Sequence, residues 1–310
     1  MAQEILASPQ LRSMAPARKP LTQPSEGAFA LISWTFFILM HLACLGAFFV
    51  GVSPVAVAMA VALYLIRMFA ITAFYHRYFS HRAFKTSRWA QFLFGFLGAT
   101  SAQQGPLWWA EKHRHHHKYS DMPEDLHSPL QSGFFMSHIG WVPLLKNVGT
   151  DYRKIPDLAK FPELVWLDKN HILPPVILAG SLWGLGSVLE HFWPALGSNG
   201  MQMLVWGFFV STVVLYHGTF TINSLCHVWG SRRYATKDDS RNNFWLALIT
   251  LGEGWHNNHH YYATSARQGF FWWEIDISYY LLRLLGVLGI VWDFKQVPAH
   301  LKAKQIRTGL

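Results

Sequence analysis

Four stretches of the chain are each as long and as apolar as a helix that crosses a lipid bilayer, which takes about 20 residues. They span residues 29–50, 52–75, 172–193 and 201–222. Hydrophobic residues make up 51% of the chain and charged residues only 14%, a balance typical of proteins that are solvated partly by lipid. We therefore predict an all-α membrane protein with four transmembrane helices.

Two ionisable residues inside these stretches, and two shorter apolar stretches elsewhere, add detail to this prediction. Arg67 and Glu190 fall within the stretches, and such groups usually face protein or water or lie near the end of a span. We therefore expect Glu190 close to the membrane boundary. Residues 92–97 and 279–292 are apolar but too short to cross, so we predict interfacial or buried helices there.

The distribution of basic residues predicts the orientation. The short connections at residues 51–53 and 194–200 contain no Lys or Arg, whereas every basic residue except Arg67 lies in the other segments outside the spans. The positive-inside rule then places both termini and the long loop 76–171 in the cytoplasm. We expect the spans to form two hairpins below a cytoplasmic helical cap.

The composition of the two ends predicts the domain boundaries, and the net charge bears on the binding partner. Residues 1–28 are rich in proline and polar residues and are predicted to be a disordered tail, followed by one membrane domain at 29–295 and a C-terminal tail at 296–310. The net charge of +9 does not indicate nucleic-acid binding, because no nucleic-acid motif accompanies it. Attraction to anionic lipid head groups explains the charge.

Two histidine clusters share one spacing. His113, His116 and His117 stand at positions i, i+3 and i+4, which lie within an arc of about 100° on a helix, and 256, 259 and 260 repeat the pattern. His115 falls outside that arc. A solvated basic patch is the alternative for the first cluster, but the second copy of the spacing argues against coincidence.

Further histidines extend the set. His76 and His81 are five residues apart, about 140° on a helix, so they share a face only if the helix ends or bends between them. Asn223 and His227 are four apart and share a face; a capping role is the alternative for His227. His127 and His138 follow the first cluster and could support it from behind.

These histidines predict a dinuclear metal site. The predicted ligands are nine imidazoles, His76, His81, His113, His116, His117, His227, His256, His259 and His260. A structural zinc site closes with four ligands, so nine suit two ions of four or five coordination. Imidazole suits zinc, copper and iron. Dioxygen chemistry, with O2 as co-substrate, would make the two ions iron, and we expect Asn223 as a partner through water or behind the ligands.

The same segments resemble those of a known family. Residues 76–81 (HRYFSH), 113–121 (HRHHHKYSD) and 252–260 (GEGWHNNHH), together with Asn223 to His227, resemble the integral-membrane fatty acyl desaturases. The similarity is to the stearoyl-CoA (Δ9) group and its bacterial relatives, and it extends from about residue 29 to 295. It implies a di-iron centre held by the nine histidines, with Asn223 reaching one metal through water.

The resemblance also implies a substrate tunnel that bends beside the metals at Gln103, Trp109 and Thr219, and the insertion of a cis double bond into a saturated acyl chain. Without the resemblance, Trp109 would be an interfacial anchor and the other two ordinary polar residues. Relatives that act on coenzyme A esters tend to carry Arg-Asp where this chain has Glu111 and Lys112. The acyl carrier therefore stays open between acyl-CoA, phospholipid and acyl carrier protein.

The chain needs an external reductase, because it has neither a Gly-rich dinucleotide fingerprint nor a haem-attachment motif. We expect a ferredoxin, rubredoxin or cytochrome b5-like donor on the basic face, with Arg232, Arg233 and Lys237 as candidate contacts. Two other functions compete with the desaturase. One is a di-iron lipid hydroxylase or ketolase, and the other is a non-enzymatic membrane metal-binding or transport protein.

Overall fold

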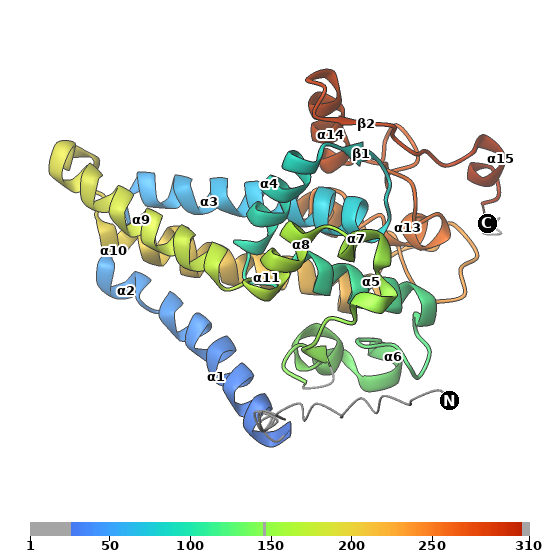
Figure 1. Cartoon of the computed structure of the whole chain (residues 1–310), viewed down its shortest axis with the longest axis horizontal. Coiled ribbons are helices and arrows are strands. Elements are labelled where there is room, and N and C mark those ends of the chain that lie inside the picture. Colours follow the sequence, from blue (N-terminus) through green and yellow to red (C-terminus); the bar gives the residue numbers. More distant parts are fainter. Residues whose placement is uncertain (1–25, 145–146, 306–310) are drawn as a thin grey trace, which may run out of the picture.

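A computed structural model of the chain describes residues 26–144 and 147–305 (Figure 1). Its four helical segments that are long and apolar enough to cross a membrane are Leu31–Val50, Pro54–Ser80, Leu173–Phe192 and Gly200–His227. Each predicted span coincides with one of them, although the second and fourth segments continue beyond the predicted ends. Most of the predicted N-terminal tail lies outside the described residues, as do the last five residues of the C-terminal one.

The spans are built from short consecutive elements. The first contains α1 (Glu26–Cys44) and α2 (Ala47–Val50), the second α3 (Pro54–Phe69) and the π-helix η1 (Ala70–Ser80), and the third α9 (Leu173–Phe192). The fourth contains α10 (Gly200–Gln202), the π-helix η6 (Met203–Val210), α11 (Ser211–Ser224) and the 3-10 turn η7 (Leu225–His227). Ser53 caps α3 by accepting a hydrogen bond from the Ala56 N–H at 3.1 Å.

Arg67 is fully buried between the second and fourth spans. Its guanidinium donates hydrogen bonds to Thr212 Oγ1 at 2.8 Å, to the Thr100 carbonyl at 3.3 Å and to Ser211 Oγ. An arginine facing lipid could not keep these partners, so the side chain ties the two spans together.

Shorter elements follow the second span and surround its end. They are α4 (Arg88–Ala99), α5 (Pro106–Tyr119), α6 (Pro129–Ser132), the π-helix η2 (Met136–Gly140), the 3-10 turn η4 (Tyr152–Lys154), α7 (Pro156–Ala159) and α8 (Pro162–Lys169). The 3-10 turn η5 (Pro194–Leu196) joins the last two spans, and α12 (Phe244–Ile249), α13 (His256–Tyr261), α14 (Ile277–Val287) and α15 (Ala299–Lys302) follow the fourth. The short helix α15 lies in the segment expected to be a tail.

One small β-ribbon departs from an all-helical fold. The strands β1 (Lys85–Thr86) and β2 (Val291–Trp292) pair antiparallel, with Lys85 opposite Trp292. The apolar stretch 92–97 lies inside α4, as predicted, but the stretch 279–292 divides between α14 and β2. Gly289, whose φ of 72° suits a residue without a side chain, lies between them.

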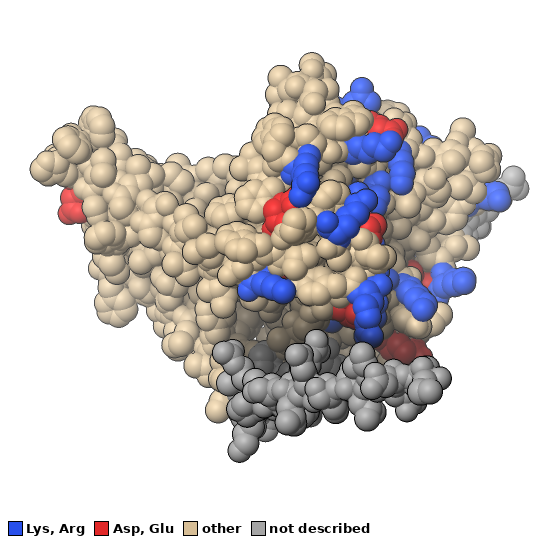
Figure 2. All heavy atoms as spheres, viewed as in Figure 1, with Lys and Arg blue, Asp and Glu red and all other residues tan. Residues whose placement is uncertain are grey.

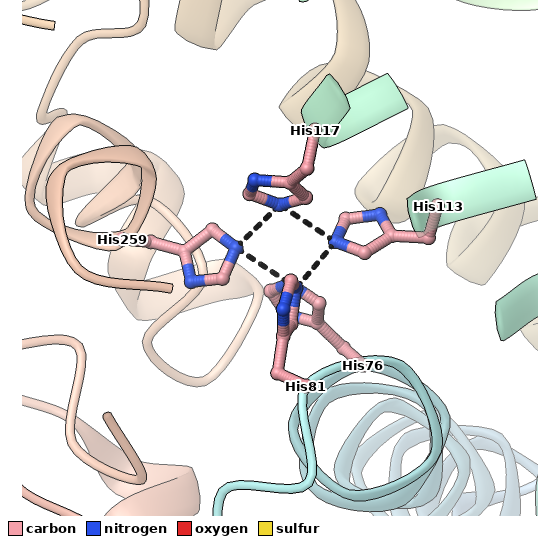
Figure 3. A group of neighbouring side chains, drawn as sticks. All are labelled: His76, His81, His113, His117 and His259. Carbon is pink, nitrogen blue, oxygen red and sulfur yellow. Dashed lines mark hydrogen bonds between the residues drawn. The ribbon is translucent and has the colours of Figure 1, made fainter. Parts of the chain in front are cut away.

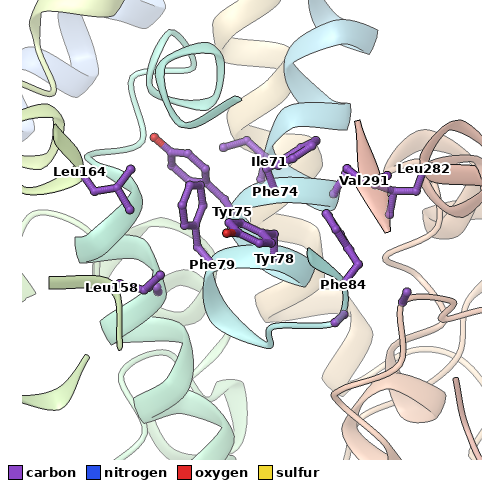
Figure 4. Packing of buried hydrophobic residues seen from close by; sticks show 14 of the residues in the cluster. Ile71, Phe74, Tyr75, Tyr78, Phe79, Phe84, Leu158, Leu164, Leu282 and Val291 are labelled. Atoms are coloured by element: carbon purple, nitrogen blue, oxygen red, sulfur yellow. The ribbon is translucent and has the colours of Figure 1, made fainter. Parts of the chain in front are cut away.

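A buried cluster fixes the end of the second span. Phe74, Tyr75 and Phe79 of η1 pack with Leu158 and Leu164 of α7 and α8 (Figure 4). Phe74 also stacks on Phe94 with ring centres 3.7 Å apart. Because η1 also packs along α5, the apolar cluster holds the histidines of both elements in a fixed relation. On the face shown in Figure 2, Lys and Arg gather over the half that contains these shorter elements, whereas the opposite end of the long helices carries almost no charge.

Candidate metal centre

Five of the predicted histidines meet at one point (Figure 3). His76 lies in η1, and His81 is the residue that follows η1. His113 and His117 lie in α5, and His259 lies in α13. Adjacent Nε2 atoms lie 2.9 Å apart for His76 and His259, 2.9 Å for His81 and His113, and 3.0 Å for His113 and His117. The five ligand atoms lie within 4.8 Å of one another, which is compact enough for a single ion.

A π-helix explains how His76 and His81 share a face. Backbone hydrogen bonds in a π-helix run from residue i+5 to residue i, and the His81 N–H donates to the His76 carbonyl at 3.3 Å. Positions five residues apart therefore stack along the helix axis. We expected a helix that ended or bent between the two residues, and η1 does end at Ser80, one residue before His81. The wide last turn of the π-helix also helps to bring the two imidazoles to one side.

The other four predicted histidines form a second group. His116 belongs to α5, His227 to η7, and His256 and His260 to α13, with ligand atoms again within 4.8 Å of one another. The Nε2 atoms of His227 and His256 are 3.1 Å apart. Because α5 and α13 each contribute to both groups, the two groups are neighbours.

Carboxylates stand behind four of the nine imidazoles. The Nδ1 atoms of His227 and His260 lie 2.8 Å from Asp121 and Asp238, respectively. The other two pairs are His116 with Asp125, at 3.0 Å, and His76 with Glu253. An Nδ1–H that donates to a carboxylate leaves the lone pair on Nε2, so each of these rings is oriented and polarised as a metal ligand.

Glu253 is itself held by a buried network. Arg77 donates to Glu253 Oε1 at 3.0 Å and to Asp276 Oδ2 at 3.0 Å, and both carboxylates are buried. These supporting acids were not predicted as site residues. The usable signal was that Asp121 and Asp125 closely follow the 113–117 cluster and that Glu253 lies three residues before His256.

The electrostatics favour neutral imidazoles. Burial lowers the pKa well below its ordinary value for five of the ligands, His81, His113, His117, His256 and His259. Burial also lowers the pKa of His260 to about 4, although the Asp238 carboxylate opposes the change. For His116, burial would lower the pKa, but the carboxylate of Asp125 outweighs it and raises the value.

This donor set fits metal ions. Two Nε2 atoms 2.9–3.1 Å apart need a proton or a metal ion between them, because two bare lone pairs at that distance repel each other. His260 Nε2 is buried and has no hydrogen-bond partner among the described residues, yet it belongs to the four-histidine group. Five nitrogens in one group and four in the other suit two ions of imidazole-binding metals such as iron, copper or zinc.

A cavity adjoins the five-histidine group. It has a volume of about 390 Å³, and its lining includes Gln103, Trp109, His113, Thr219 and Asn223. A smaller cavity of about 50 Å³ is lined by histidines of both groups and shares four of these residues, Trp109, His113, Thr219 and Asn223.

The three residues that the resemblance assigns to a tunnel lie together here. Gln103 Nε2 donates a hydrogen bond to Thr219 Oγ1 at 3.0 Å, and the ring of Trp109 stacks on His113 with centres 4.8 Å apart. Asn223 lines both cavities, the smaller one together with His116 and His256.

The remaining histidines near the first cluster differ in position. His127 packs on His116 with ring centres 4.4 Å apart, behind the four-histidine group. His138 instead approaches His217 and Ser224, at 3.0 and 2.9 Å. His115 lies outside both groups, with its Nε2 2.9 Å from the Glu124 carbonyl oxygen.

Comparisons with known proteins agree with this geometry. A profile of the family described as "Fatty acid desaturase" matches residues 52–287. The chain is 38% identical to palmitoyl-monogalactosyldiacylglycerol delta-7 desaturase of Arabidopsis thaliana, over 77% of this chain and 62% of the relative. It is 36% identical to sn-2 palmitoyl-lipid 9-desaturase of Nostoc sp., over 86% and 92%.

A third relative is named for a different acyl carrier. Acyl-CoA C20 Delta5-desaturase of Anemone leveillei is 34% identical over 79% of this chain and 75% of the relative. The chain spans less than two thirds of the length of the Arabidopsis delta-7 enzyme. The profile match covers most of the chain and includes both histidine groups, so the chain belongs to the fatty acid desaturase family.

Proposed function

We propose that the chain is an oxygen-dependent fatty acyl desaturase that inserts a cis double bond, at the Δ9 position, into a saturated acyl chain. The observation that carries the proposal is that two groups of histidines, of four and five members, adjoin cavities lined by Trp109 and Thr219. The relatives named above, all desaturases, support the reaction class, and the Nostoc enzyme supports the position.

The nine histidines would hold two iron ions, five on one and four on the other, with Asn223 joining the second through water. What bound iron supplies is redox activation of O2, because no amino-acid side chain can break an unactivated methylene C–H bond. The overall reaction consumes O2, two electrons and two protons. It removes two hydrogens from adjacent carbons and forms one carbon–carbon double bond and two molecules of water.

The protein's own residues position the acyl chain. Trp109 lines both cavities, and its ring centre lies 5.9 and 4.8 Å from those of His76 and His113, so an acyl chain beside the histidines would contact it. Gln103 and Thr219 form a hydrogen bond in the wall of the larger cavity, and this pair would bend the acyl chain toward the smaller cavity, which Thr219 also lines. A fixed bend sets which carbons pass the metals, and positioning decides between a double bond and an alcohol.

Electrons would come from a separate ferredoxin, rubredoxin or cytochrome b5-like protein that docks on the basic face (Figure 2). Two of the candidate contacts are engaged within the chain: Arg232 pairs with Asp239 at 3.0 Å and Arg233 with Glu274 at 2.8 Å. The third candidate, Lys237, is exposed, so its positive charge is accessible to a partner.

The orientation in the membrane belongs to the same proposal. We place the histidine groups and both termini in the cytoplasm of a bacterial cell, with two helical hairpins in the inner membrane and one desaturase domain at residues 29–295 between two tails. The gathering of Lys and Arg over the histidine-bearing half supports this orientation.

Expression in cells that lack unsaturated fatty acids tests the proposal. Mass spectrometry of the total lipids is expected to show acyl chains that have lost two hydrogens, with the double bond at Δ9, and the His116→Ala variant is the negative control. Gain of one oxygen would indicate the hydroxylase or ketolase instead. Unchanged lipids despite a metal-loaded protein and a supplied electron donor would favour a metal-binding protein and contradict the proposal.

A further inference from the structure

The larger cavity is bounded by three membrane-spanning segments. Its wall includes Ile32, Ser33, Phe36 and Phe37 of α1, while other parts come from the start of α9 and from α11. Ile32 and Phe36 line the cavity and are 63% and 55% exposed. On this side α1 contributes the wall, and little else covers these side chains.

The first span is the most loosely packed of the four. Only 6% of its most apolar window is buried, against 56% for the span Gly200–His227. In Figure 1, α1 runs away from the other spans, so that its N-terminal half stands apart from them. Few buried contacts make an element easy to displace, so this half of α1 is suited to move.

The contacts that hold α1 are concentrated in a few side chains. Phe37 stacks on Tyr216 with ring centres 6.2 Å apart, and Trp34 stacks on Phe135 at the same distance. Further along the helix, His41 Nε2 lies 3.1 Å from His217 Nε2, which a single shared proton can bridge. The imidazole pair fixes the middle of α1 beside α11, while its beginning is held by aromatic stacking alone among the described contacts.

The polar end of the cavity offers little positive charge. Lys112 is the one lysine or arginine among the described lining residues, and its ammonium lies 2.7 Å from the buried Glu111 carboxylate. Lys154 approaches the other oxygen of the same carboxylate at 2.9 Å. A coenzyme A head group carries several phosphates and needs a cluster of uncompensated cations, whereas a glycerolipid head group can stay at the membrane surface.

We propose that the N-terminal half of α1 forms one side of a lateral portal, through which acyl chains still esterified to membrane glycerolipid pass directly from the bilayer to the histidine groups. The inference rests on the proposed desaturase function and names its substrate class. The cavity shares His113, Trp109 and Thr219 with the smaller cavity, whose lining includes histidines of both groups, so a chain that enters beside α1 has a path to the site.

The test compares two acyl carriers with the iron-loaded, full-length protein in nanodiscs of dioleoyl phospholipid. One arm contains phosphatidylglycerol or monogalactosyldiacylglycerol with a deuterated palmitoyl chain, and the other contains deuterated palmitoyl-CoA. Ferredoxin, rubredoxin and cytochrome b5, each with its reductase, supply electrons in parallel runs. Mass spectrometry then counts the loss of two deuterium atoms, and we expect desaturation of a glycerolipid at least about tenfold faster than that of palmitoyl-CoA.

Two variants of α1 locate the path. Ser33→Trp fills the portal and is expected to slow glycerolipid desaturation by at least about tenfold. Leu39→Trp adds the same bulk at a 57% exposed position that does not line the cavity, and is expected to stay within about twofold of the unmodified protein. Metal content measured on each variant identifies a folded protein.

Each outcome has one meaning. Faster desaturation of palmitoyl-CoA than of either glycerolipid, or equal rates for the two α1 variants, overturns the portal and leaves the desaturase function standing. Absence of a double bond in every arm contradicts the desaturase function itself and the portal with it.

Discussion

The carboxylate behind His260 gives the sharpest single-site test of the metal centre. Asp238 is 9% exposed and accepts hydrogen bonds from His260 Nδ1–H at 2.8 Å and from the Ser240 N–H at 3.1 Å. Burial would raise its pKa, but the hydrogen bond and charge of His260 and the hydrogen bonds from Ser240 together outweigh burial and hold the pKa well below its ordinary value, so the side chain is charged at neutral pH.

Asp238→Asn keeps the shape of the side chain and removes this charge. A hydrogen bond to a charged acceptor contributes about 1–2 kcal/mol more than one to a neutral acceptor, and loss of a carboxylate behind a metal-binding histidine typically weakens binding by about 10- to 100-fold. The two figures agree, since tenfold in affinity corresponds to about 1.4 kcal/mol. The reduced metal affinity should affect the ion bound by the four-histidine group, because His260 belongs to that group.

The assay measures bound iron per chain against free Fe²⁺ in chelator buffers, without oxygen. At free iron that just saturates the unmodified protein with two ions, Asp238→Asn should retain one. Asp239→Asn is the matched control, because the adjacent Asp239 side chain pairs with Arg232 at the surface. Superimposable binding curves for the two variants, with equal thermal stability, would refute the role assigned to Asp238.

Three further predictions concern the metals and the tunnel. Removing both ions with a chelator should lower the thermal unfolding midpoint, because metal at about 100 times its dissociation constant stabilises the fold by about 2.7 kcal/mol per site; an unchanged midpoint in calorimetry counts against the fit. His116→Ala should abolish double-bond formation in expressing cells, whereas His115→Ala, which removes a ring outside both groups, should leave product within about twofold; equal losses would show that the groups are wrongly drawn. Thr219→Val removes the acceptor of the Gln103 hydrogen bond, so product analysis should find the double bond spread over neighbouring positions, and a single unchanged position contradicts the bend.

Much of the fold followed from local sequence patterns. The four spans were visible because each stretch must be apolar along its whole length, whatever it packs against. The end of the second span was missed, because Arg77 looks like the start of an aqueous loop. Arg77 can be buried there because it pairs with Glu253 and Asp276, which lie 176 and 199 residues away in the chain. No local sequence pattern contains that pairing.

Part of the candidate metal site could likewise be predicted from local spacing, and part could not. The i, i+3, i+4 spacing of 113, 116 and 117 is a property of one helix, and it correctly set His115 apart from its neighbours. How the nine imidazoles split into five and four depends on how η1, α5, η7 and α13 meet, which spacing alone does not contain. The tunnel residues came from the resemblance, because a Gln, a Trp and a Thr carry no chemical signature of their own.

The decisive experiment on the two-iron centre is anomalous X-ray diffraction at the iron absorption edge, from crystals of the iron-loaded protein. We expect two peaks per chain, one surrounded by the Nε2 atoms of the five-histidine group and the other by those of the four-histidine group. A single peak, or peaks outside these two groups, would contradict that expectation.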